Sequence, residues 1–364
     1  MTQAATQGDS TLTDERAAWS AVPVSRRTPM QDWPWTEACF DSLYQNDCPT
    51  FVFIGDDHTE RHAAAAFAKR GQWAPHLFLV GAEENGEPVD VLYKDEESAY
   101  ALAERVSRLG AAIRFGHFPA QSLFYKAFTE ISRKHGVLLR APVKGSPYIE
   151  LDDGWRDPLS QFTSRRRSDL RRMMRKAEKI GAVTFEIVAP TLDNVDQLLD
   201  EAIAVEAKSW KSRSQTAIAD NENQAAFYRD YARLAACDGI FRISHMKIDG
   251  QLVAMQLAVE YEKGFWLFKI GYDETYGACS PGNLLLLETI RRAVENGLSS
   301  FEFLGKSADW TKVWTDTERP NVAMRFYPHT VSGYICLIRD AAGIGVRRAR
   351  SVMKSLICKE RTGQ

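Results

Sequence analysis

The sequence lacks the patterns that mark metal-binding and disulfide-rich proteins. Its six cysteines, at positions 39, 48, 237, 279, 336 and 358, form no CxxC pair and stand at no zinc-ligand spacing from a histidine. His58 and His62 are four residues apart, but HTERH lacks the order of the HExxH motif, and we expect it to cap or border the start of a helix. We therefore expect reduced thiols, no metal ion and no permanently bound cofactor.

Long apolar runs are missing as well. No stretch approaches the roughly 18 apolar residues of a membrane-spanning helix, and the N-terminus has no apolar signal core. Residues 1–20 predict a disordered or partly helical start, because the first dozen are small and polar. The sequence thus predicts a cytoplasmic protein. The C-terminal tail leaves open the alternative that the protein binds peripherally to the inner membrane.

A strong excess of charge is absent from the chain as a whole but not from its parts. The net charge is −2, yet Ser164–Gly181 carries eight Lys/Arg against two acids and Arg339–Arg361 carries seven against two, so the remainder lies near −13. Any anionic partner is expected at these two basic segments. The first lacks the aromatic residues that read bases, which argues against nucleic acid. It is either a solvated helix face beside a ligand cleft or a contact for an anionic ligand or membrane.

Strands and helices alternate along the chain. The apolar and charged fractions are 45% and 26%, as in soluble globular proteins, and 364 residues exceed one typical core. Residues 77–80 and 89–93 are expected to form a hairpin around the turn 84–87. The predicted order of strands and helices in the first half is repeated after residue 160. We expect an α/β fold with a mixed sheet, built from units at 21–160 and 161–330 and followed by a tail at 331–364.

One stretch, Phe265–Gly297, predicts a strand, a tight loop and a helix. Phe265–Tyr272 is aromatic and bulky, as in a buried strand, and Ser280-Pro281-Gly282-Asn283 supplies the turn before an apolar helical pattern. The free N–H groups of a helix's first turn attract anions such as a pyrophosphate. The alternative is ordinary α/β connectivity, since most such turns bind nothing.

Three motifs carry a family resemblance. SPGNLLLLETI at 280–290, KIGYDETY at 269–276 and WKSRSQTAI at 210–218 resemble the GNAT-type acyltransferase domain first described in bacterial cellulose-biosynthesis acetyltransferases, which is related in fold to the Fem peptidoglycan aminoacyltransferases. The match covers residues 160–320, with a weaker echo in MQDWPWTEACF at 30–40. Gln215 replaces a common glycine, and Trp310-Thr311 replaces a Tyr-Lys pair. The resemblance implies two tandem GNAT-like units in a Fem-like arrangement, an acyl-CoA co-substrate and an amine acceptor.

The resemblance also implies where the acyl-CoA would bind. Its pyrophosphate would rest on the N–H groups from Ser280 to Leu285, Pro281 excepted, and its pantetheine arm would lie along the strand before them. The donor-binding residues implied are Phe268, Ile270, Gly271, Ser280, Pro281, Gly282, Asn283, Leu284 and Leu285.

Acyl transfer to an amine needs a base for the amine and a donor for the departing thiolate. The candidate catalytic residues are Glu206, Lys269, Tyr272, Asp273, Tyr276 and Lys312. Glu206 is alternatively a solvated helix residue that pairs with Lys208 or Arg213. Lys269 either steadies a phosphate or a developing thiolate, or forms a structural ion pair with Asp273 or Glu302.

Four residues are candidates for substrate binding: Trp210, Lys211, Trp310 and Trp314. Trp310 and Trp314 are four residues apart, so they equally fit one packed helix face. In Fem-like relatives a lysine in this region lies near the acceptor site, and Lys312 matches it only with a slip of one position.

The tail, residues 334–360, mixes apolar residues with arginines and lysines. A helix of this kind either lies on an anionic membrane surface or packs on the protein body. The leading hypothesis is an acyl-CoA-dependent N-acyltransferase acting on an amine of a cell-envelope molecule, with a lipid amine such as the sphingoid base of bacterial ceramide synthases ahead of an amino sugar. Aminoacyl transfer from tRNA, as in Fem enzymes, lacks their coiled-coil arm here. A non-catalytic GNAT-like partner protein is the alternative from another class.

Overall fold

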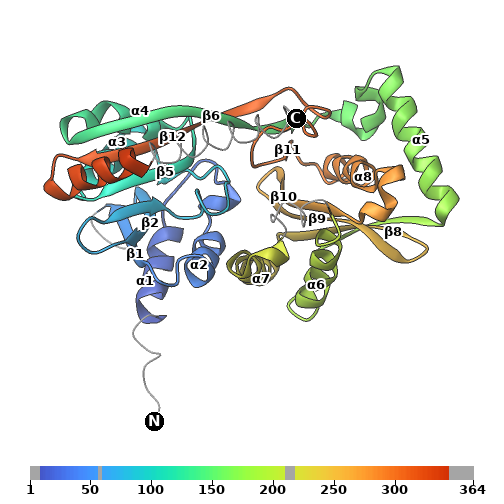
Figure 1. Cartoon of the computed structure of the whole chain (residues 1–364), viewed down its shortest axis with the longest axis horizontal. Helices are drawn as coiled ribbons and strands as arrows, with labels where there is room; N and C mark the ends of the chain where they lie inside the picture. Colours follow the sequence, from blue (N-terminus) through green and yellow to red (C-terminus); the bar gives the residue numbers. More distant parts are fainter. Residues whose placement is uncertain (1–8, 56–59, 210–217, 344–364) are drawn as a thin grey trace, which may run out of the picture.

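The computed structural model describes residues 9–55, 60–209 and 218–343. Their strands form one twelve-stranded mixed sheet with helices on both faces (Figure 1). The helices are α1 Asp9–Ser20, α2 Trp33–Ser42, α3 Glu96–Ser107, α4 Leu123–Ile131, α5 Ser164–Ile180, α6 Val195–Glu206, α7 Glu222–Cys237 and α8 Pro281–Glu295, with a further helix at 331–343. The strands are β1 Cys48–Ile54, β2 Ala63–Arg70, β3 His76–Leu79, β4 Leu92–Tyr93, β5 Ala112–Pro119, β6 Gly136–Glu150, β7 Val183–Val188, β8 Phe241–Ile248, β9 Gln251–Tyr261, β10 Gly264–Tyr272, β11 Ser300–Glu302 and β12 Glu318–Pro328.

The sheet consists of two halves of similar construction. The strands run β1-β2-β3-β5-β12-β6-β11-β10-β9-β8-β7, with β4 paired to β2 off this path. Each half contains one parallel pair joined by a helix: β3–α3–β5 in the first half and β10–α8–β11 in the second. The other pairs of the sheet are antiparallel. The predicted α/β fold with a mixed sheet is therefore confirmed.

Two long strands join the halves. In Figure 1, β6 crosses from one half to the other; its residues 136–147 pair with β12 and its residues 148–150 with β11. β12 comes late in the chain but lies between β5 and β6, in the first half. The predicted units at 21–160 and 161–330 stay a prediction. Strand β12 belongs to the second unit by sequence, but it pairs with β5 of the first.

The apolar core is continuous between the halves. Trp35 of α2 is fully buried and contacts side chains of the second half. Its ring lies 4.9 Å from Phe227 and 5.2 Å from Tyr231, both on α7, and stacks at 5.4 Å on Phe268 of β10. Buried aromatic residues dominate core energetics because each removes a large apolar area from water. The halves are thus packed together on the face that carries α2 and α7.

Several expected elements differ from the structure. The helix expected to start near His62 does not form, and residues 63–70 are strand β2. Its five alanines are buried, the strand pairs with β1 on one side and with β4 and β3 on the other, and sheet packing overrides the helix propensity of alanine. The hairpin expected around 84–87 does not form, since β3 pairs with β2 and β5 instead. Strand β12 went unrecognised because Pro320 interrupts its pattern. The turn Asp249-Gly250 joins β8 to β9, and both residues have positive φ, as a two-residue hairpin turn requires.

The described cysteines all carry free thiols. Within the described ranges no group of His, Cys, Asp and Glu side chains is arranged to hold a metal ion. The same ranges contain no helix with the length and apolarity needed to cross a bilayer.

Candidate active site

A cavity opens where strands β10 and β11 separate. They pair in parallel only over Gly264–Trp266 and Ser300–Glu302, and β10 then continues to Tyr272 without a described strand on that side. A bulge between Leu267 and Lys269, where the register with β9 shifts, adds to the divergence. The resulting cavity has a volume of about 620 Å³, in the size range of sites for small molecules and cofactors.

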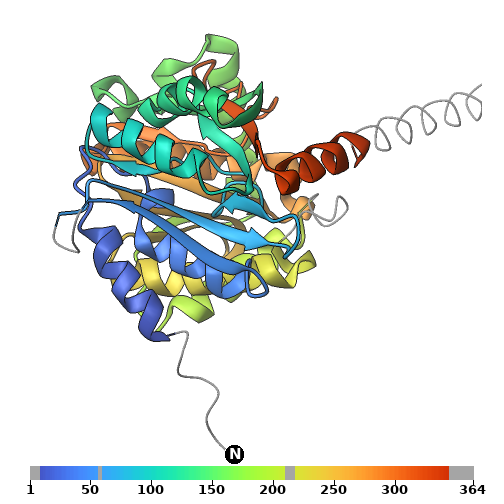
Figure 2. The same ribbon diagram turned by 90° about the vertical axis from the view of Figure 1, so that its left-hand side faces the viewer.

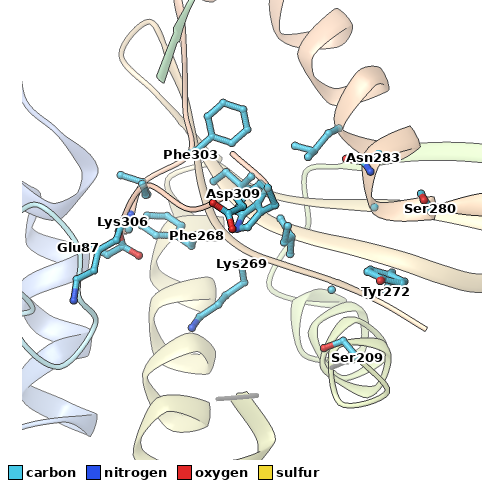
Figure 3. Close-up of a pocket in the computed structure, with 18 residues that line it drawn as sticks. Glu87, Ser209, Phe268, Lys269, Tyr272, Ser280, Asn283, Phe303, Lys306 and Asp309 are labelled. Carbon is cyan, nitrogen blue, oxygen red and sulfur yellow. The ribbon is translucent and has the colours of Figure 1, made fainter. Parts of the chain in front are cut away.

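The lining of the cavity comes from both halves of the chain (Figure 3). Most of it belongs to β10, to the start of α8 and to the segment after β11, and one residue belongs to the first half. The lining residues are Glu87, Ser209, Leu267, Phe268, Lys269, Ile270, Gly271, Tyr272, Ser280, Gly282, Asn283, Leu286, Phe303, Leu304, Gly305, Lys306, Asp309 and Trp310.

Helix α8 points its N-terminus at this cavity. Ser280 precedes it with φ 48° and makes no side-chain cap, and the first turn contains no acidic residue. Pro281 has no N–H, and the amide of Gly282 donates to no acceptor among the described residues. A helix start with an open amide and no carboxylate favours an anion.

The amide set is smaller than the sequence predicts. Ser280 donates its own N–H to Gly277 O (3.1 Å), and the amides of Asn283 and Leu284 donate to Ser280 O (3.0 and 3.3 Å). The tight turn before α8 thus engages these three amides, so the expectation of free N–H groups is wrong at Ser280, Asn283 and Leu284, whereas the Gly282 amide makes no such bond. Leu284 and Leu285 do not line the cavity; they are buried in the core that α8 forms with β8 and β9.

Gly271 allows β10 to approach α6 closely. A Cβ atom at Gly271 would lie 2.8 Å from the Cα of Glu206, a distance that real Cβ contacts do not reach. The side chain of Glu206 is fully buried and accepts a hydrogen bond from the Ile218 amide (2.8 Å). The alternative of a solvated Glu206 is therefore wrong, and Lys208 pairs with Asp273 instead. Glu206 does not line the cavity, and its catalytic role stays a prediction.

Asp273 is held in a structural arrangement. Its carboxylate accepts hydrogen bonds from the amide and hydroxyl of Thr275 (3.0 and 2.6 Å) and lies 3.5 Å from Lys208 Nζ. Burial raises the pKa of Asp273, but the bonds from Thr275 and the Lys208 charge outweigh it, so the pKa lies below its usual value. A carboxylate in this state is a weak base.

Lys269 lies in the middle of the cavity lining. Its Nζ atom is 5.3 Å from the centroid of the buried Tyr228 ring, a cation–π contact. The alternative of an ion pair between Lys269 and Asp273 or Glu302 is wrong. Asp273 pairs with Lys208, and Glu302 pairs with Arg319 (2.6 Å).

The two candidate tyrosines have different surroundings. Tyr272 lines the cavity, and a Cβ atom on Gly282 would lie 3.5 Å from its ring. Tyr276 donates to Gln251 Oε1 (3.0 Å) in an exposed position outside the cavity. Of the two phenols, Tyr272 is the one placed to act on a group in the cavity.

The late segment contributes different residues from those expected. Trp310 lines the cavity and stacks edge-on against Phe303 at 5.9 Å. Trp314 is buried against Phe162 (5.5 Å), and Lys312 is exposed; neither lines the cavity. Trp310 and Trp314 lie in turns, so the idea of one packed helix face is wrong. Trp210 and Lys211 lie outside the described residues.

Sequence reasoning missed three charged residues of the lining. Lys306 and Asp309 follow β11 and are exposed at the cavity. Glu87, expected in a surface turn, is 5% exposed and accepts a hydrogen bond from the Gly305 amide (2.8 Å). Burial raises the pKa of Glu87 to about 7, although the Gly305 bond and the Lys269 charge act to lower it. Only the contact between the halves places Glu87 here, and no local pattern signals it.

The comparisons with known proteins agree with this geometry. Residues 164–312, in the second half, match the family model described as an acetyltransferase (GNAT) domain, in line with the predicted GNAT-like fold. A comparison with curated proteins finds no match.

Solved structures share the fold over most of the chain. FemX has a TM-score of 0.57 and 11% identity, covering 86% of this chain and 95% of its own. A protein of unknown function from Bacteroides thetaiotaomicron also has a TM-score of 0.57 and 11% identity, over 86% and 97%. The C-terminal domain of a protein described as a lysylphosphatidylglycerol synthetase from Agrobacterium fabrum has a TM-score of 0.51 and 15% identity, over 84% and 95%. At these identities the likeness concerns the fold.

Proposed function

We propose that the protein transfers an acyl group from a coenzyme A thioester to an amine. The observation that carries the proposal is the cavity between β10 and β11, which meets the uncapped start of α8. A thioester is long and thin, with phosphates at one end and the reactive carbonyl at the other. The phosphates would lie at the amide of Gly282, and the pantetheine arm along β10 toward Phe268.

The basic helix α5 supports the same orientation. It packs against α8 and against the 3₁₀ segment η7 (Glu274–Cys279), and Lys176 donates to Ala278 O (3.2 Å) beside the start of α8. The eight cationic residues at 164–181 thus concentrate positive charge near the proposed phosphate site. The phosphates of coenzyme A match that charge.

We further propose that the acceptor is an amine on a lipid of the cell envelope. The support is the helix at 331–343, which projects from the body in Figure 2. Four apolar side chains at helical spacing lie on its exposed side: Val331, Tyr334, Ile335 and Ile338. Trp73, 92% exposed, precedes the turn at Ala74, whose carbonyl accepts from Cys336 of that helix. In the sequence, four basic residues follow between 347 and 354, a combination typical of contact with an anionic membrane surface.

An acyl-transfer assay tests both parts of the proposal. Purified protein is incubated with acyl-CoAs from acetyl to palmitoyl, with sphinganine or glucosamine as the amine, and thiol release and the amide product are measured. Long-chain transfer to sphinganine is expected. Transfer of acetyl to glucosamine alone would replace the lipid acceptor by an amino sugar. The absence of transfer together with the absence of coenzyme A binding would favour a non-catalytic partner protein.

A further inference from the structure

We propose that Glu87, supplied by the first half of the chain, is the catalytic residue that binds the acceptor amine as an ammonium ion and takes its proton. This inference rests on the proposed acyl transfer. It assigns the acceptor end of the cavity, and it explains why the cavity is built from both halves.

The first argument is position. In Figure 3, Glu87 and Lys306 lie at one end of the cavity, Ser280 and Asn283 at the other, and Phe268 and Lys269 between them. A thioester with its phosphates at the start of α8 and its arm along β10 would direct its carbonyl toward the Glu87 end. An amine bound at Glu87 would then meet the carbonyl inside the cavity.

The second argument is the state of the carboxylate. Glu87 is 5% exposed, and its one hydrogen bond to a described residue, from the Gly305 amide (2.8 Å), engages Oε2. The loop 303–306 that supplies this amide also forms the wall of the cavity. The bond fixes the carboxyl group relative to the cavity and leaves Oε1 for an ammonium ion.

The surrounding charges are consistent with a neutral-pH base. Lys269 faces Glu87 from β10, and the buried Tyr228 faces it from α7; burial and the Glu87 charge both raise the pKa of Tyr228. On the neighbouring β5, burial and the Lys306 charge lower the pKa of His117. Tyr228 and His117 therefore both remain neutral near pH 7. Burial raises the pKa of Glu87 to about 7, close to the working pH of an efficient general base.

The other acids of the site are less suited. Asp273 is occupied by Thr275 and Lys208, and Glu206 does not line the cavity. Asp309 does line it but is exposed to solvent, which lowers its influence on a bound charge. Glu87 is the one buried carboxylate among the lining residues that the structure describes.

The step balances with these groups alone. The acceptor enters as an ammonium ion, and one of its protons passes to the Glu87 carboxylate. The neutral nitrogen attacks the thioester carbonyl, so that a C–N bond forms and the C–S bond breaks. A second proton from the nitrogen ends on the departing thiolate, and Tyr272, beside Gly282 at the opposite end of the cavity, takes no part in this transfer. The products are an amide and a free thiol, and the proton on Glu87 passes to water.

The test compares Glu87→Gln with Asp90→Asn. The glutamine side chain keeps an oxygen for the Gly305 amide but cannot accept a proton. Asp90 lies three residues away, and burial likewise raises its pKa to about 7, but it bonds to Ser122 and Val91 outside the cavity. We expect Glu87→Gln to lower kcat/KM for palmitoyl-CoA and sphinganine by about 10²- to 10⁴-fold, with the thermal shift produced by coenzyme A unchanged. Asp90→Asn should retain the wild-type rate.

The pH profile separates a chemical role from a structural one. Wild-type and Asp90→Asn kcat/KM should rise tenfold per pH unit up to about pH 7, and this limit near pH 7 should vanish in Glu87→Gln. Because Glu87 binds the amine as an ammonium ion, kcat/KM of the wild type and of Asp90→Asn should fall again above the pKa of the amine, whereas Glu87→Gln should rise toward that pKa, since it can use only the neutral amine. If Glu87→Gln fails to fold, Glu87→Asp carries the test, with a lower rate and the rise near neutral pH retained.

The outcomes distinguish the inference from the proposed function. If Glu87→Gln keeps the wild-type rate and pH profile, Glu87 is not the base although acyl transfer stands. A Glu87→Asp variant whose rate no longer depends on pH near 7 would overturn the assignment in the same way. If the wild-type protein transfers no acyl group to sphinganine or glucosamine, the proposed function fails and the role of Glu87 with it.

Discussion

The two parallel crossovers of the sheet, β3–α3–β5 and β10–α8–β11, share a topology but end differently at the start of their helices. Helix α3 is capped by Asp95, whose side chain accepts from the Ser98 amide (2.9 Å), and Glu96 and Glu97 follow in its first turn. Helix α8 has no side-chain cap and no acid in its first turn. Carboxylates at a helix start satisfy the amides and repel other anions.

The space after the first strand of each crossover differs as well. In the first half, a Cβ on Gly81 would lie 2.3 Å from Trp35 Nε1, so the indole of α2 fills the position after β3, and the adjacent cavity measures only about 10 Å³. In the second half, the separation of β10 from β11 leaves about 620 Å³. One crossover is filled by packing, and the other leaves an open cavity. Topology alone therefore does not identify the binding half.

The largest expected effect is the loss of stability when Trp35, which fills the crossover of the first half, is replaced. Trp35→Ala removes a fully buried indole that contacts Phe227, Tyr231 and Phe268 across the halves. We expect a loss of about 3–5 kcal/mol in the free energy of unfolding, measured by urea denaturation. Trp73→Ala, at a site 92% exposed, is the control and should cost little. A Trp35→Ala protein of wild-type stability would mean that α2 does not join the halves.

Glu87, which the first half supplies to the cavity, should lower the free energy of unfolding in a pH-dependent way. The pKa of Glu87 is about 7 in the folded protein, above its ordinary value of 4.5, so the folded state holds a proton that the unfolded chain releases between these values. Its contribution to stability therefore falls as pH rises from 4.5 to 7, by about 3 kcal/mol in total. Glu87→Gln should gain this amount relative to wild type between pH 4.5 and pH 8 in urea titrations. An unchanged difference between the two proteins would show that Glu87 is not desolvated.

Filling the open crossover should weaken donor binding. An indole at position 282 would occupy the space between α8 and Tyr272, where a Cβ already lies 3.5 Å from the ring. We expect Gly282→Trp to weaken coenzyme A binding at least tenfold, about 1.4 kcal/mol, in isothermal titration. Gly277→Trp is the matched control, because open space surrounds Gly277. Equal affinity of the two variants for coenzyme A would contradict the proposal that its phosphates bind at the start of α8.

The smallest effect is expected when a carboxylate is added at the start of α8 or removed from the start of α3. Asn283→Asp places a carboxylate at the start of α8 without changing its shape, and repulsion should weaken coenzyme A binding by a few-fold, less so at high salt. Asp95→Asn at α3 should leave binding unchanged and cost at most about 1 kcal/mol of stability. Binding that responds equally to both changes would contradict the contrast between the crossovers.

Much of the candidate site in the second half could be predicted from the sequence. The strand, turn and helix at 265–297 follow from local patterns, and nine of the residues proposed for binding or catalysis line the cavity: Phe268, Lys269, Ile270, Gly271, Tyr272, Ser280, Gly282, Asn283 and Trp310. The remainder depends on long-range contacts. Ala63–Arg70 is a strand only because two strands flank it, and Glu87 reaches the cavity only because the halves pack together. Neither fact is encoded within a short window of sequence.

The measurement that tests the account most directly is the stoichiometry of coenzyme A binding to the wild-type chain by isothermal titration calorimetry. The account predicts one molecule per chain, bound at the crossover β10–α8–β11. Two molecules per chain would show that the capped helix α3 also starts a binding site. No binding at millimolar coenzyme A would contradict the proposal that the open crossover holds a thioester.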